Sequence, residues 1–295
     1  MTPELQPILF EPNSATPQPF RSQLLKWIGN KQRFANEIIS YFPPSFGTYR
    51  EPFLGSGAVL GSLCPAVAVG SDAFAPLIEI WQTLKKSPEK LKSWYRERWD
   101  LYDSGNSVTE YYKIRDNYNK QPNGADLLFL SRACYGGVVR FRQKDGFMST
   151  PCGPHRPISP ESFDSRVNEW YRRTQGATFV RQGYETAMLS AAKGDLIYCD
   201  PPYTFTQSIL YGAQSFSLAT LFDVIGECKE TGAFIALSID GSKKSGEMLL
   251  DVKIPKGLFK REIEINVGRS MLKRFQMEGK TLEQEVVADR LLLTY

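Results

Sequence analysis

The residue types best suited to chemistry stand together at Asp200-Pro201-Pro202-Tyr203. Within four residues this segment offers a carboxylate, main-chain oxygens and an aromatic ring. It follows the apolar run 196–199, which predicts a buried strand of a parallel sheet. The carboxyl ends of such strands form the edge where open α/β sheets bind their ligands. We therefore expect an active site here rather than an ordinary surface turn.

A glycine-rich turn is the second candidate. Residues 51–57 read Glu-Pro-Phe-Leu-Gly-Ser-Gly between a predicted strand and a predicted helix. Gly55 and Gly57 allow the backbone to approach a ligand closely, and Asp72 after the next strand can accept hydrogen bonds from ribose hydroxyls. With Gly61 the spacing comes close to a dinucleotide fingerprint. A nicotinamide-dependent dehydrogenase is therefore one alternative, but it leaves residues 200–203 without a role.

Composition excludes several kinds of site. The 295 residues include one histidine, His155, and five cysteines that are never spaced C-x-x-C. This argues against a histidine-rich metal site, a cysteine-ligated zinc and a disulfide framework. Carboxylates, backbone groups, aromatic rings and a bound cofactor remain to carry the chemistry. No run approaches the roughly 18 to 20 apolar residues of a membrane span, and no signal peptide is recognisable, so we expect a soluble protein.

Short strands alternate with helices around these motifs. Apolar residues at helical spacing from Phe34 to Phe42 predict a helix that stops at Pro43-Pro44. Further helices are expected at 58–63, 76–86 and 218–230, and strands at 48–53, 66–70, 195–199, 233–239, 259–267 and 286–294. This alternation predicts an α/β protein with a parallel sheet covered by helices.

The alternation lapses between residues 87 and 180, where helices are expected around 88–102, 109–119, 124–135 and 161–173. Residues 132–181 hold nine Lys and Arg against four Asp and Glu, a net charge of +5, whereas the whole chain carries +4. A basic segment on a near-neutral scaffold favours a polyanionic partner, although a solvated basic face is the alternative. We divide the chain into a flexible tail (1–20), a sheet domain (21–86 and 177–295) and an inserted, mostly helical domain (87–176).

Taken in order, these motifs resemble those of the Dam-like N6-adenine-specific DNA methyltransferases, the D12 class with the alpha-type motif order. The resemblance extends over nearly all of residues 24–295. It rests on Lys26-Trp-Ile-Gly-Asn-Lys31, the segment 51–57, Asp72, the tetrapeptide 200–203, and Arg269-Ser270. It implies a Rossmann-like class I methyltransferase sheet with an inserted target-recognition domain.

The resemblance also implies a cofactor, S-adenosylmethionine, and a substrate, the N6 amine of an adenine flipped out of double-stranded DNA. Asp200 and the carbonyl of Pro201 would each accept one amine N–H, with Pro202 and Tyr203 completing the motif and Tyr203 facing the base. The residues implied for cofactor binding are Trp27, Gly29, Lys31, Glu51, Pro52, Phe53, Gly55, Gly57, Asp72, Tyr184 and Asp200. Relatives often carry an acidic residue just before the aromatic one. Gly183 stands there in this chain, and Glu185 is an alternative acid. No metal is expected.

In the insertion, Tyr135-Gly-Gly-Val-Val-Arg140-Phe resembles the family's aromatic-loop-arginine segment. This implies a bidentate contact from Arg140 to a guanine and insertion of Tyr135 beside the extruded base. Other basic residues are expected to contact DNA phosphates without reading the sequence: Arg142, Lys144, Arg172, Arg173, Lys273 and Arg274. Arg269, in the late basic loop, is also expected to bind DNA. Departures from the family pattern at Gly136 and at 153–157 leave the recognised DNA sequence open.

The resemblance implies a protein of the cytoplasm of a prokaryotic or phage-infected cell, with double-stranded DNA as its partner. It leaves open a cognate restriction endonuclease that acts on the same site. N4-cytosine methylation is the nearest alternative because the acceptor amine is chemically equivalent, although that tetrapeptide usually begins with serine. RNA adenine methylation and a DNA-binding protein with an inactive cofactor site are further alternatives.

Overall fold

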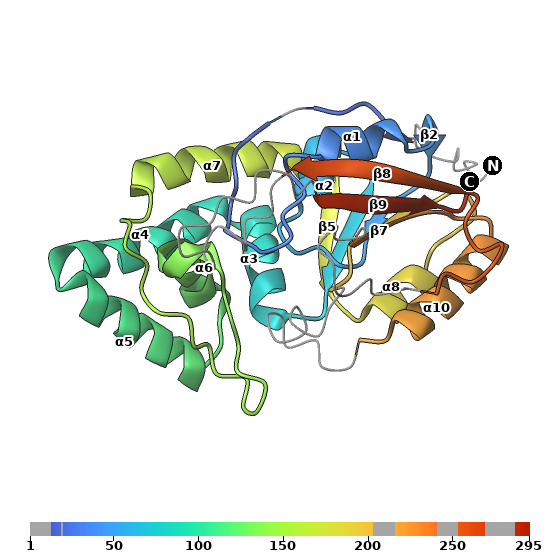
Figure 1. Ribbon diagram of the computed structural model, residues 1–295. Helices are drawn as coiled ribbons and strands as arrows, with labels where there is room; N and C mark the ends of the chain where they lie inside the picture. The colour runs from blue at the N-terminus through green and yellow to red at the C-terminus, as the bar shows by residue number, and fades with distance from the viewer. Residues whose placement is uncertain (1–12, 19, 203–215, 241–252, 269–286) are drawn as a thin grey trace, which may run out of the picture.

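The computed structural model describes residues 13–18, 20–202, 216–240, 253–268 and 287–295. In these residues a seven-stranded sheet has the order β5-β4-β3-β6-β7-β9-β8 (Figure 1). Its strands are β3 (Tyr49–Glu51), β4 (Ala68–Asp72), β5 (Ala177–Arg181), β6 (Leu196–Cys199), β7 (Phe234–Asp240), β8 (Arg261–Gly268) and β9 (Val287–Leu293). A separate pair is formed by β1 (Asn13–Ser14) and β2 (Ser45–Phe46).

The order of the strands creates a topological switch point between β3 and β6. The chain builds outward from β3 through β4 to β5, and in the other direction from β6 to β7, with all of these neighbours parallel. Doubly wound sheets bind their ligands beyond the carboxyl ends of the strands at such a point. The sheet therefore directs the ends of β3, β4 and β6 to one edge.

Both faces of the sheet are covered, as expected for buried parallel strands. Along β6, Leu196 and Tyr198 belong to one apolar cluster, and Ile197 and Cys199 belong to the other. This follows from the alternation of side chains along a strand. The first cluster includes residues of α1 (Ala35–Ser40), α2 (Ala58–Leu63) and α3 (Ala75–Lys86); the second includes residues of α8 (Tyr184–Leu189) and α10 (Leu218–Glu230).

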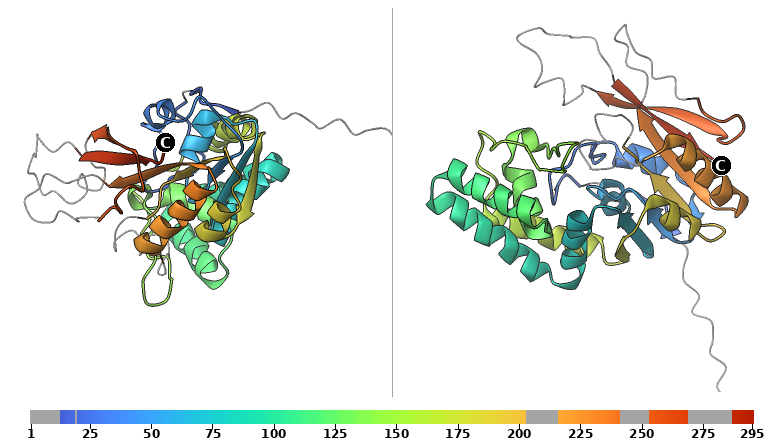
Figure 2. Two further views of the ribbon diagram at one scale, coloured as in Figure 1. Left: turned by 90° about the vertical axis from the view of Figure 1, so that its right-hand side faces the viewer. Right: turned by 90° about the horizontal axis from the view of Figure 1, so that it is seen from below.

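Helices fill the chain between α3 and β5. They are α4 (Pro88–Ser104), α5 (Ser107–Lys120), α6 (Gly124–Ala133), the short 3-10 helix η1 (Tyr135–Gly137) and α7 (Pro160–Arg173). The side chains of Asn106, Asn123 and Ser159 accept backbone N–H groups at the starts of α5, α6 and α7, which explains where these helices begin. The helices gather at one end of the molecule, and β8 and β9 lie at the other (Figures 1 and 2).

The structure differs from the sequence-based expectations in the direction of one strand and in several elements. The last strand, β9, runs antiparallel between β7 and β8, so the sheet is mostly rather than wholly parallel. Several elements were not predicted: β5, whose outer position in the sheet leaves it only partly apolar, the six-residue α8, the short strands β1 and β2, and η1. The helix 218–230 and the strand-helix order around it are confirmed.

The described part of the N-terminal segment is bonded to the sheet domain. The side chain of Asn13 donates to the carbonyls of Gly47 (2.6 Å) and Val67 (3.0 Å) and accepts from the N–H of Ala66 (2.6 Å). Further along, the Phe20 ring meets the edge of Trp170, with the ring centroids 5.0 Å apart. Residues 13–18 and 20 thus follow the surface of the protein.

Candidate active site

Three carboxylates follow three neighbouring parallel strands. Glu51 ends β3, Asp72 ends β4, and Asp200 comes directly after β6. Because these strands are parallel, their carboxyl ends meet at one edge, with Glu51 and Asp200 on either side of the switch point. The residues that the sequence singled out from separate motifs are therefore brought together by the sheet.

Lys31 connects two carboxylates at this edge. Its Nζ lies 3.2 Å from Oδ1 of Asp200 and 2.9 Å from Oδ2 of Asp289, which belongs to β9. The lysine is buried, and burial by itself would lower the pKa of its ammonium group; Asp200 and Asp289 outweigh that effect and raise the pKa above its usual value. Lys31 is therefore positively charged, as a partner of two acids should be.

Glu51 is the most deeply buried acid of the site. Its Oε2 accepts the hydroxyl of Tyr49 at 2.8 Å and the N–H of Leu60 at 3.0 Å. Burial raises the pKa of Glu51 to about 8; the hydrogen bond from Tyr49 opposes the rise, and the charge of Asp200 adds to it. The carboxyl group is consequently protonated at neutral pH, and it cross-links β3 to the start of α2.

The glycine turn is fixed by two neighbouring elements. Gly55 and Gly57 both have positive φ angles, +48° and +60°, which glycine adopts without strain. The indole N–H of Trp81 in α3 donates to the carbonyl of Gly55 at 3.1 Å, and Oδ2 of Asp72 accepts the N–H of Gly55 at 3.2 Å. The sequence motif is therefore a preformed turn.

Asp72 also organises the chain after β4. Its Oδ1 accepts the N–H of Phe74 at 3.0 Å, and the backbone N–H groups of Gly55 and Ala73 also bond to the carboxylate. Burial raises the pKa of Asp72, while these N–H groups oppose the rise. A carboxylate oxygen can accept a second hydrogen bond, so Asp72 retains capacity for hydroxyl donors.

An aromatic group stands beyond β3 and β5. The rings of Phe53 and Tyr184 are stacked, with centroids 5.1 Å apart, and Phe216 meets both rings edge-on at 5.9 Å and 5.7 Å. Burial, followed by the neighbouring Glu185, raises the pKa of Tyr184 to about 12. A side-chain carbon added at Gly183 would meet no atom within 4 Å. A side chain at position 183, next in the sequence to Tyr184, would therefore face open space.

The other expected site residues differ in how exposed they are. Trp27 is buried and packs against the glycine turn, Gly29 is exposed with φ +75°, and Pro52 is buried. Pro201 is buried and Pro202 is half-buried after Asp200. Tyr203, Arg269, Lys273 and Arg274 lie outside the described residues.

Comparison with known proteins agrees with this arrangement. The family model of the D12 class N6 adenine-specific DNA methyltransferases matches residues 27–263. The chain belongs to this family.

Curated relatives support the same family. The type II methyltransferase M1.LlaDCHI of Lactococcus lactis subsp. cremoris is 26% identical over 266 residues, covering 84% of this chain and 90% of the relative. The DNA adenine methylase of Serratia marcescens is 30% identical over 205 residues, covering 66% of this chain and 73% of the relative. A DNA adenine methylase of Vibrio cholerae is 27% identical over 231 residues, covering 72% and 79%.

The family assignment makes the chain an adenine-specific DNA methyltransferase. Among the alternatives that the sequence left open, it favours adenine over cytosine N4 and a methyltransferase over a nicotinamide-dependent dehydrogenase. None of the described helices is long and apolar enough to cross a membrane. Among the described residues no cluster of three or more His, Cys, Asp or Glu is arranged to hold a metal ion.

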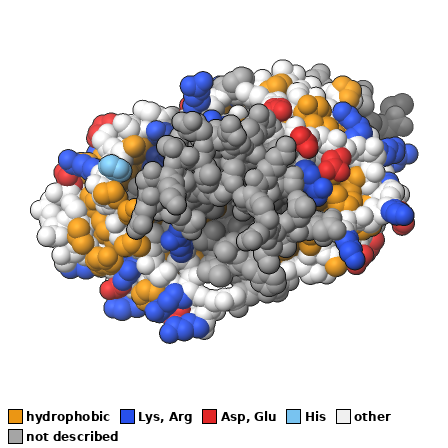
Figure 3. Space-filling view, viewed as in Figure 1, with side chains coloured by type: hydrophobic (Ala, Val, Ile, Leu, Met, Phe, Trp, Pro, Cys, Tyr) orange, Lys and Arg blue, Asp and Glu red, His pale blue; other side chains and the backbone are white. Residues whose placement is uncertain are grey.

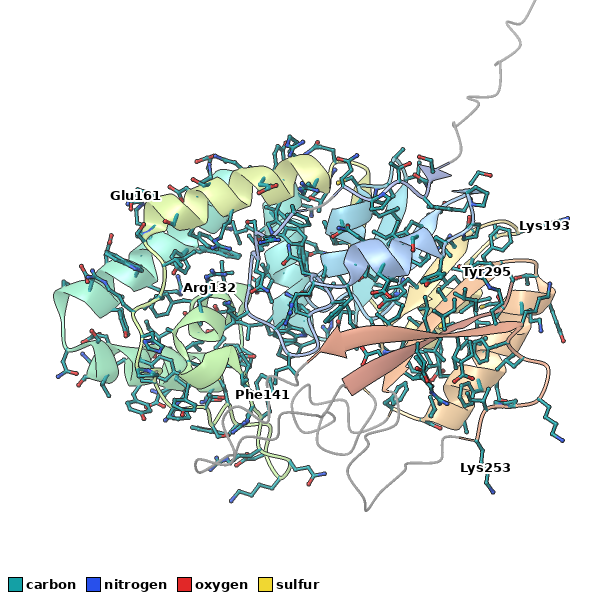
Figure 4. The ribbon with its side chains drawn as sticks, turned by 45° about the horizontal axis from the view of Figure 1, so that its top comes forward. Arg132, Phe141, Glu161, Lys193, Lys253 and Tyr295 are labelled. Carbon is teal, nitrogen blue, oxygen red and sulfur yellow. The ribbon has the colours of Figure 1, made fainter. Side chains whose placement is uncertain are left out.

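In the helical part between α3 and β5, the chain from Cys134 to Cys152 folds back on itself in a hairpin that precedes α7. Its two sides are bridged at Cys134 with Cys152 and at Phe141 with Met148. Phe141 is buried and packs edge-on against Phe74, at the start of α3, with centroids 5.5 Å apart (Figure 4). Basic side chains gather at the end of the helical part from which the hairpin projects (Figure 3).

The hairpin places the expected DNA-contacting residues at its surface. Tyr135, Arg140 and Lys144 are exposed. The Arg142 guanidinium lies 2.8 Å from Oδ2 of Asp145 and 4.2 Å from the centroid of the Phe147 ring, so its charge is paired within the hairpin. Arg140, Arg142 and Lys144 lie on the hairpin, and Tyr135 lies in η1 at the start of the hairpin.

One expected phosphate contact is wrong. Arg173 is buried, and its guanidinium donates to the carbonyls of Gln18 (2.9 Å) and Gly61 (3.2 Å) and to Glu169 (3.0 Å). It fixes the N-terminal segment against α2 and α7. The neighbouring Arg172 is exposed. Helical periodicity separates the two, because consecutive residues of a helix point in different directions.

The sequence alone did not point to Asp289, Phe216 or Trp81. Trp81 lies in a predicted helix, and its position there gives no hint that its N–H reaches Gly55. Phe216 follows a segment without periodicity. Asp289 is an acid near the start of a predicted strand, and its place at the active edge depends on the antiparallel direction of that strand. The position of Asp289 at the active edge could have been predicted only if the antiparallel direction of this strand had been known.

Proposed function

We propose that this protein transfers a methyl group from S-adenosylmethionine to the N6 amine of an adenine extruded from double-stranded DNA. The observation that carries the proposal is Asp200, held by Lys31 at the switch point of the sheet beside the glycine turn. S-adenosylmethionine supplies a methyl group on a positively charged sulfur. The protein itself has to bind the cofactor and the base and to align the adenine amine with the methyl group.

The residues at the edge fit this cofactor. The described carboxylates Asp72, Asp200 and Asp289 outnumber the single cation among them, Lys31, while the protonated Glu51 adds no charge. An excess of negative charge suits a ligand that carries a positive sulfonium. Asp72 retains acceptor capacity for ribose hydroxyls, and Phe53, Tyr184 and Phe216 offer aromatic surface for a purine. Gly29, Gly55 and Gly57 allow close approach of the backbone. We propose that these residues, with Trp27 and Pro52 supporting the turn, hold the cofactor.

Asp200 acts on the substrate in this proposal. Its carboxylate and the carbonyl of Pro201 accept the two N–H groups of the adenine amine, which turns the nitrogen lone pair toward the methyl group. The same acceptors stabilise the positive charge that develops on the nitrogen. Tyr203 supplies an aromatic face for the base. The amine is hidden inside a paired duplex, so the base must leave the stack at a cost of a few kcal/mol that contacts to DNA must offset.

DNA reading belongs to the insertion in this proposal. Residues 87–176 act as the target-recognition domain, with Arg140 reading a guanine, Tyr135 placed beside the extruded base and Lys144 on phosphate. Arg269, Lys273 and Arg274 contribute further contacts to DNA. One relative is a type II methyltransferase, which supports looking for a cognate endonuclease that cleaves the same sequence.

The test compares Asp200→Ala with the wild type. Transfer of labelled methyl groups to unmethylated DNA, with the product identified as N6-methyladenine by mass spectrometry of nucleosides, should fall by about 10² to 10³-fold in the variant. Binding of S-adenosylmethionine, measured by calorimetry, should persist. Asp223→Ala on the exposed side of α10 makes the same chemical change away from the site and should transfer like the wild type. Undiminished transfer by Asp200→Ala would refute the mechanism.

A further inference from the structure

Asp289 is a buried acid at the active edge that no motif accounts for. Its side chain is 11% exposed, and its Oδ2 accepts from Nζ of Lys31 at 2.9 Å. It lies near the start of β9, which is antiparallel to the neighbouring β7. The start of an antiparallel strand reaches the edge where parallel strands end, so Asp289 stands beside the ends of the strands that carry the site.

The bridge from Asp289 to Asp200 crosses a strand. β7 separates β6 from β9 in the sheet, so no strand pairing joins the two acids. They are connected through the ammonium group of Lys31, which belongs to the segment before α1 rather than to the sheet. Because Lys31 contacts both acids, the Lys31 ammonium group links the position of the Asp200 carboxylate to that of Asp289 on β9.

The two contacts of Lys31 are not equal. The shorter one, 2.9 Å, is to Asp289, and the longer one, 3.2 Å, is to Asp200. An ammonium group has three donors that rotate freely about a flexible stem, so one carboxylate alone does not fix its direction. A second carboxylate, held on the rigid sheet, fixes the direction of the ammonium group. Lys31 is thus anchored on β9 and presents the same charge to Asp200.

We propose that Asp289 is a positioning residue for methyl transfer: it holds the Lys31 ammonium so that Lys31 sets the orientation of the Asp200 carboxylate. The inference rests on the proposed function, in which Asp200 accepts an N–H of the adenine amine. Asp289 itself touches Lys31 and acts through it. Its removal should therefore slow the chemical step and leave the binding of cofactor and DNA nearly intact.

The first measurement is steady-state kinetics of Asp289→Asn, which keeps the shape of the side chain and removes its charge. We expect kcat, counted per S-adenosylmethionine site measured by calorimetry, to fall about tenfold or more, since misplacement of a reacting group by about 1 Å can cost 10²-fold. KM for DNA and Kd for the cofactor should change less than about threefold. Glu262→Gln is the matched control, because Glu262 pairs with Arg290, the residue next to Asp289, in an exposed contact of 3.1 Å.

A double-variant cycle shows whether Asp289 acts through Lys31. Adding Asp289→Asn to Lys31→Met should cost nothing further in kcat if the lysine carries the effect; full additivity would overturn the inference. A purely structural role predicts a lower melting temperature with unchanged kcat per cofactor site, and that result would also overturn it. If Asp289→Asn does not fold, Asp289→Glu keeps the charge and shifts it by one methylene, and the same loss of kcat is expected.

The outcomes separate the two proposals. If the wild-type protein transfers no methyl group to DNA, the proposed function fails and the inference fails with it. If the wild type is active and Asp289→Asn matches it per cofactor site, the inference alone is wrong.

Discussion

At the scale of single residues, the site combines one cation with acids in different protonation states. Glu51 accepts two hydrogen bonds through one oxygen and is buried. Burial raises the pKa of Glu51 to about 8, so this acid is neutral near pH 7, whereas Lys31 is charged between Asp200 and Asp289. A neutral Glu51 spares the site a further uncompensated negative charge.

Replacement of Glu51 should change how stability depends on pH. The pKa of Glu51 rises from 4.5 to about 8 on folding, so the folded protein holds a proton that the unfolded chain releases. This contribution is fully present below about pH 4.5 and is lost as the pH rises through 8, at up to ~1.4 kcal/mol per pH unit. Glu51→Gln imitates the protonated acid and should lack this decline.

Urea unfolding at about pH 5 and about pH 8 checks this expectation. The free energy of unfolding of Glu51→Gln, relative to the wild type, should grow by at least ~1 kcal/mol between the two conditions. Glu230→Gln, an exposed glutamate at the end of α10, should show no such change. Parallel stability curves for Glu51→Gln and the wild type would mean that Glu51 is ionised in the folded protein.

At the scale of elements, the hairpin before α7 holds the backbone of Arg140 in place by hydrogen bonds, whereas Lys144 lies at the tip of the hairpin. The N–H of Arg140 donates to Oγ1 of Thr150 at 2.9 Å, and its carbonyl accepts the N–H of Ser149, also at 2.9 Å. Its backbone is therefore held on the hairpin, next to the buried Phe141. Lys144 lies at the tip, between the paired strands. A fixed backbone suits base reading, and a mobile ammonium suits phosphate.

Arg140→Ala and Lys144→Ala should consequently have different effects, the first on sequence discrimination and the second on affinity for all DNA. For Arg140→Ala we expect relaxed choice at one base pair, a loss of about 1 to 3 kcal/mol of discrimination. For Lys144→Ala we expect weaker binding to all sequences and a shallower dependence on salt. Methylation of a library of DNA sites, read by long-read sequencing, measures the first effect. Uniform weakening by Arg140→Ala would mark it as a phosphate contact.

At the scale of the whole molecule, the insertion and the sheet share one core. A single apolar cluster includes Tyr49 of the sheet, Trp81 of α3, Tyr95 of α4 and Trp170 of α7. The rings of Trp81 and Trp170 lie 5.2 Å apart, and the indole N–H of Trp170 donates to the carbonyl of Ser22 at 3.1 Å. The segment that we propose to read DNA is therefore packed rigidly against the segment that we propose to hold the cofactor.

This shared core predicts cooperative unfolding. Far-ultraviolet circular dichroism and tryptophan fluorescence should report one coincident transition. Trp170→Ala should lower the free energy of unfolding by about 3 to 5 kcal/mol without splitting that transition. Trp94→Ala, at a half-buried position of α4, should cost clearly less. A separate transition of the helical part would show that the two parts fold independently.

Much of this protein could be predicted where the physical signal is local. The apolar run before Asp200 identified β6, the spacing of apolar residues gave the helix 218–230, and the glycines at 55 and 57 marked a turn that needs positive φ angles. Each signal spans a few neighbouring residues, because strand alternation, helix periodicity and backbone freedom are properties of short segments. The order of the motifs then pointed to the family.

Only the tertiary structure decided which distant side chains meet. Lys31 and Asp289 are 258 residues apart in the sequence, and their contact depends on β9 entering the sheet antiparallel beside β7. Arg173 carries the positive charge expected of a phosphate contact, yet the packing of α7 on the N-terminal segment buries its side chain. The direction of a strand and the rotation of a helix follow from the packing of the whole chain, so no local pattern records them.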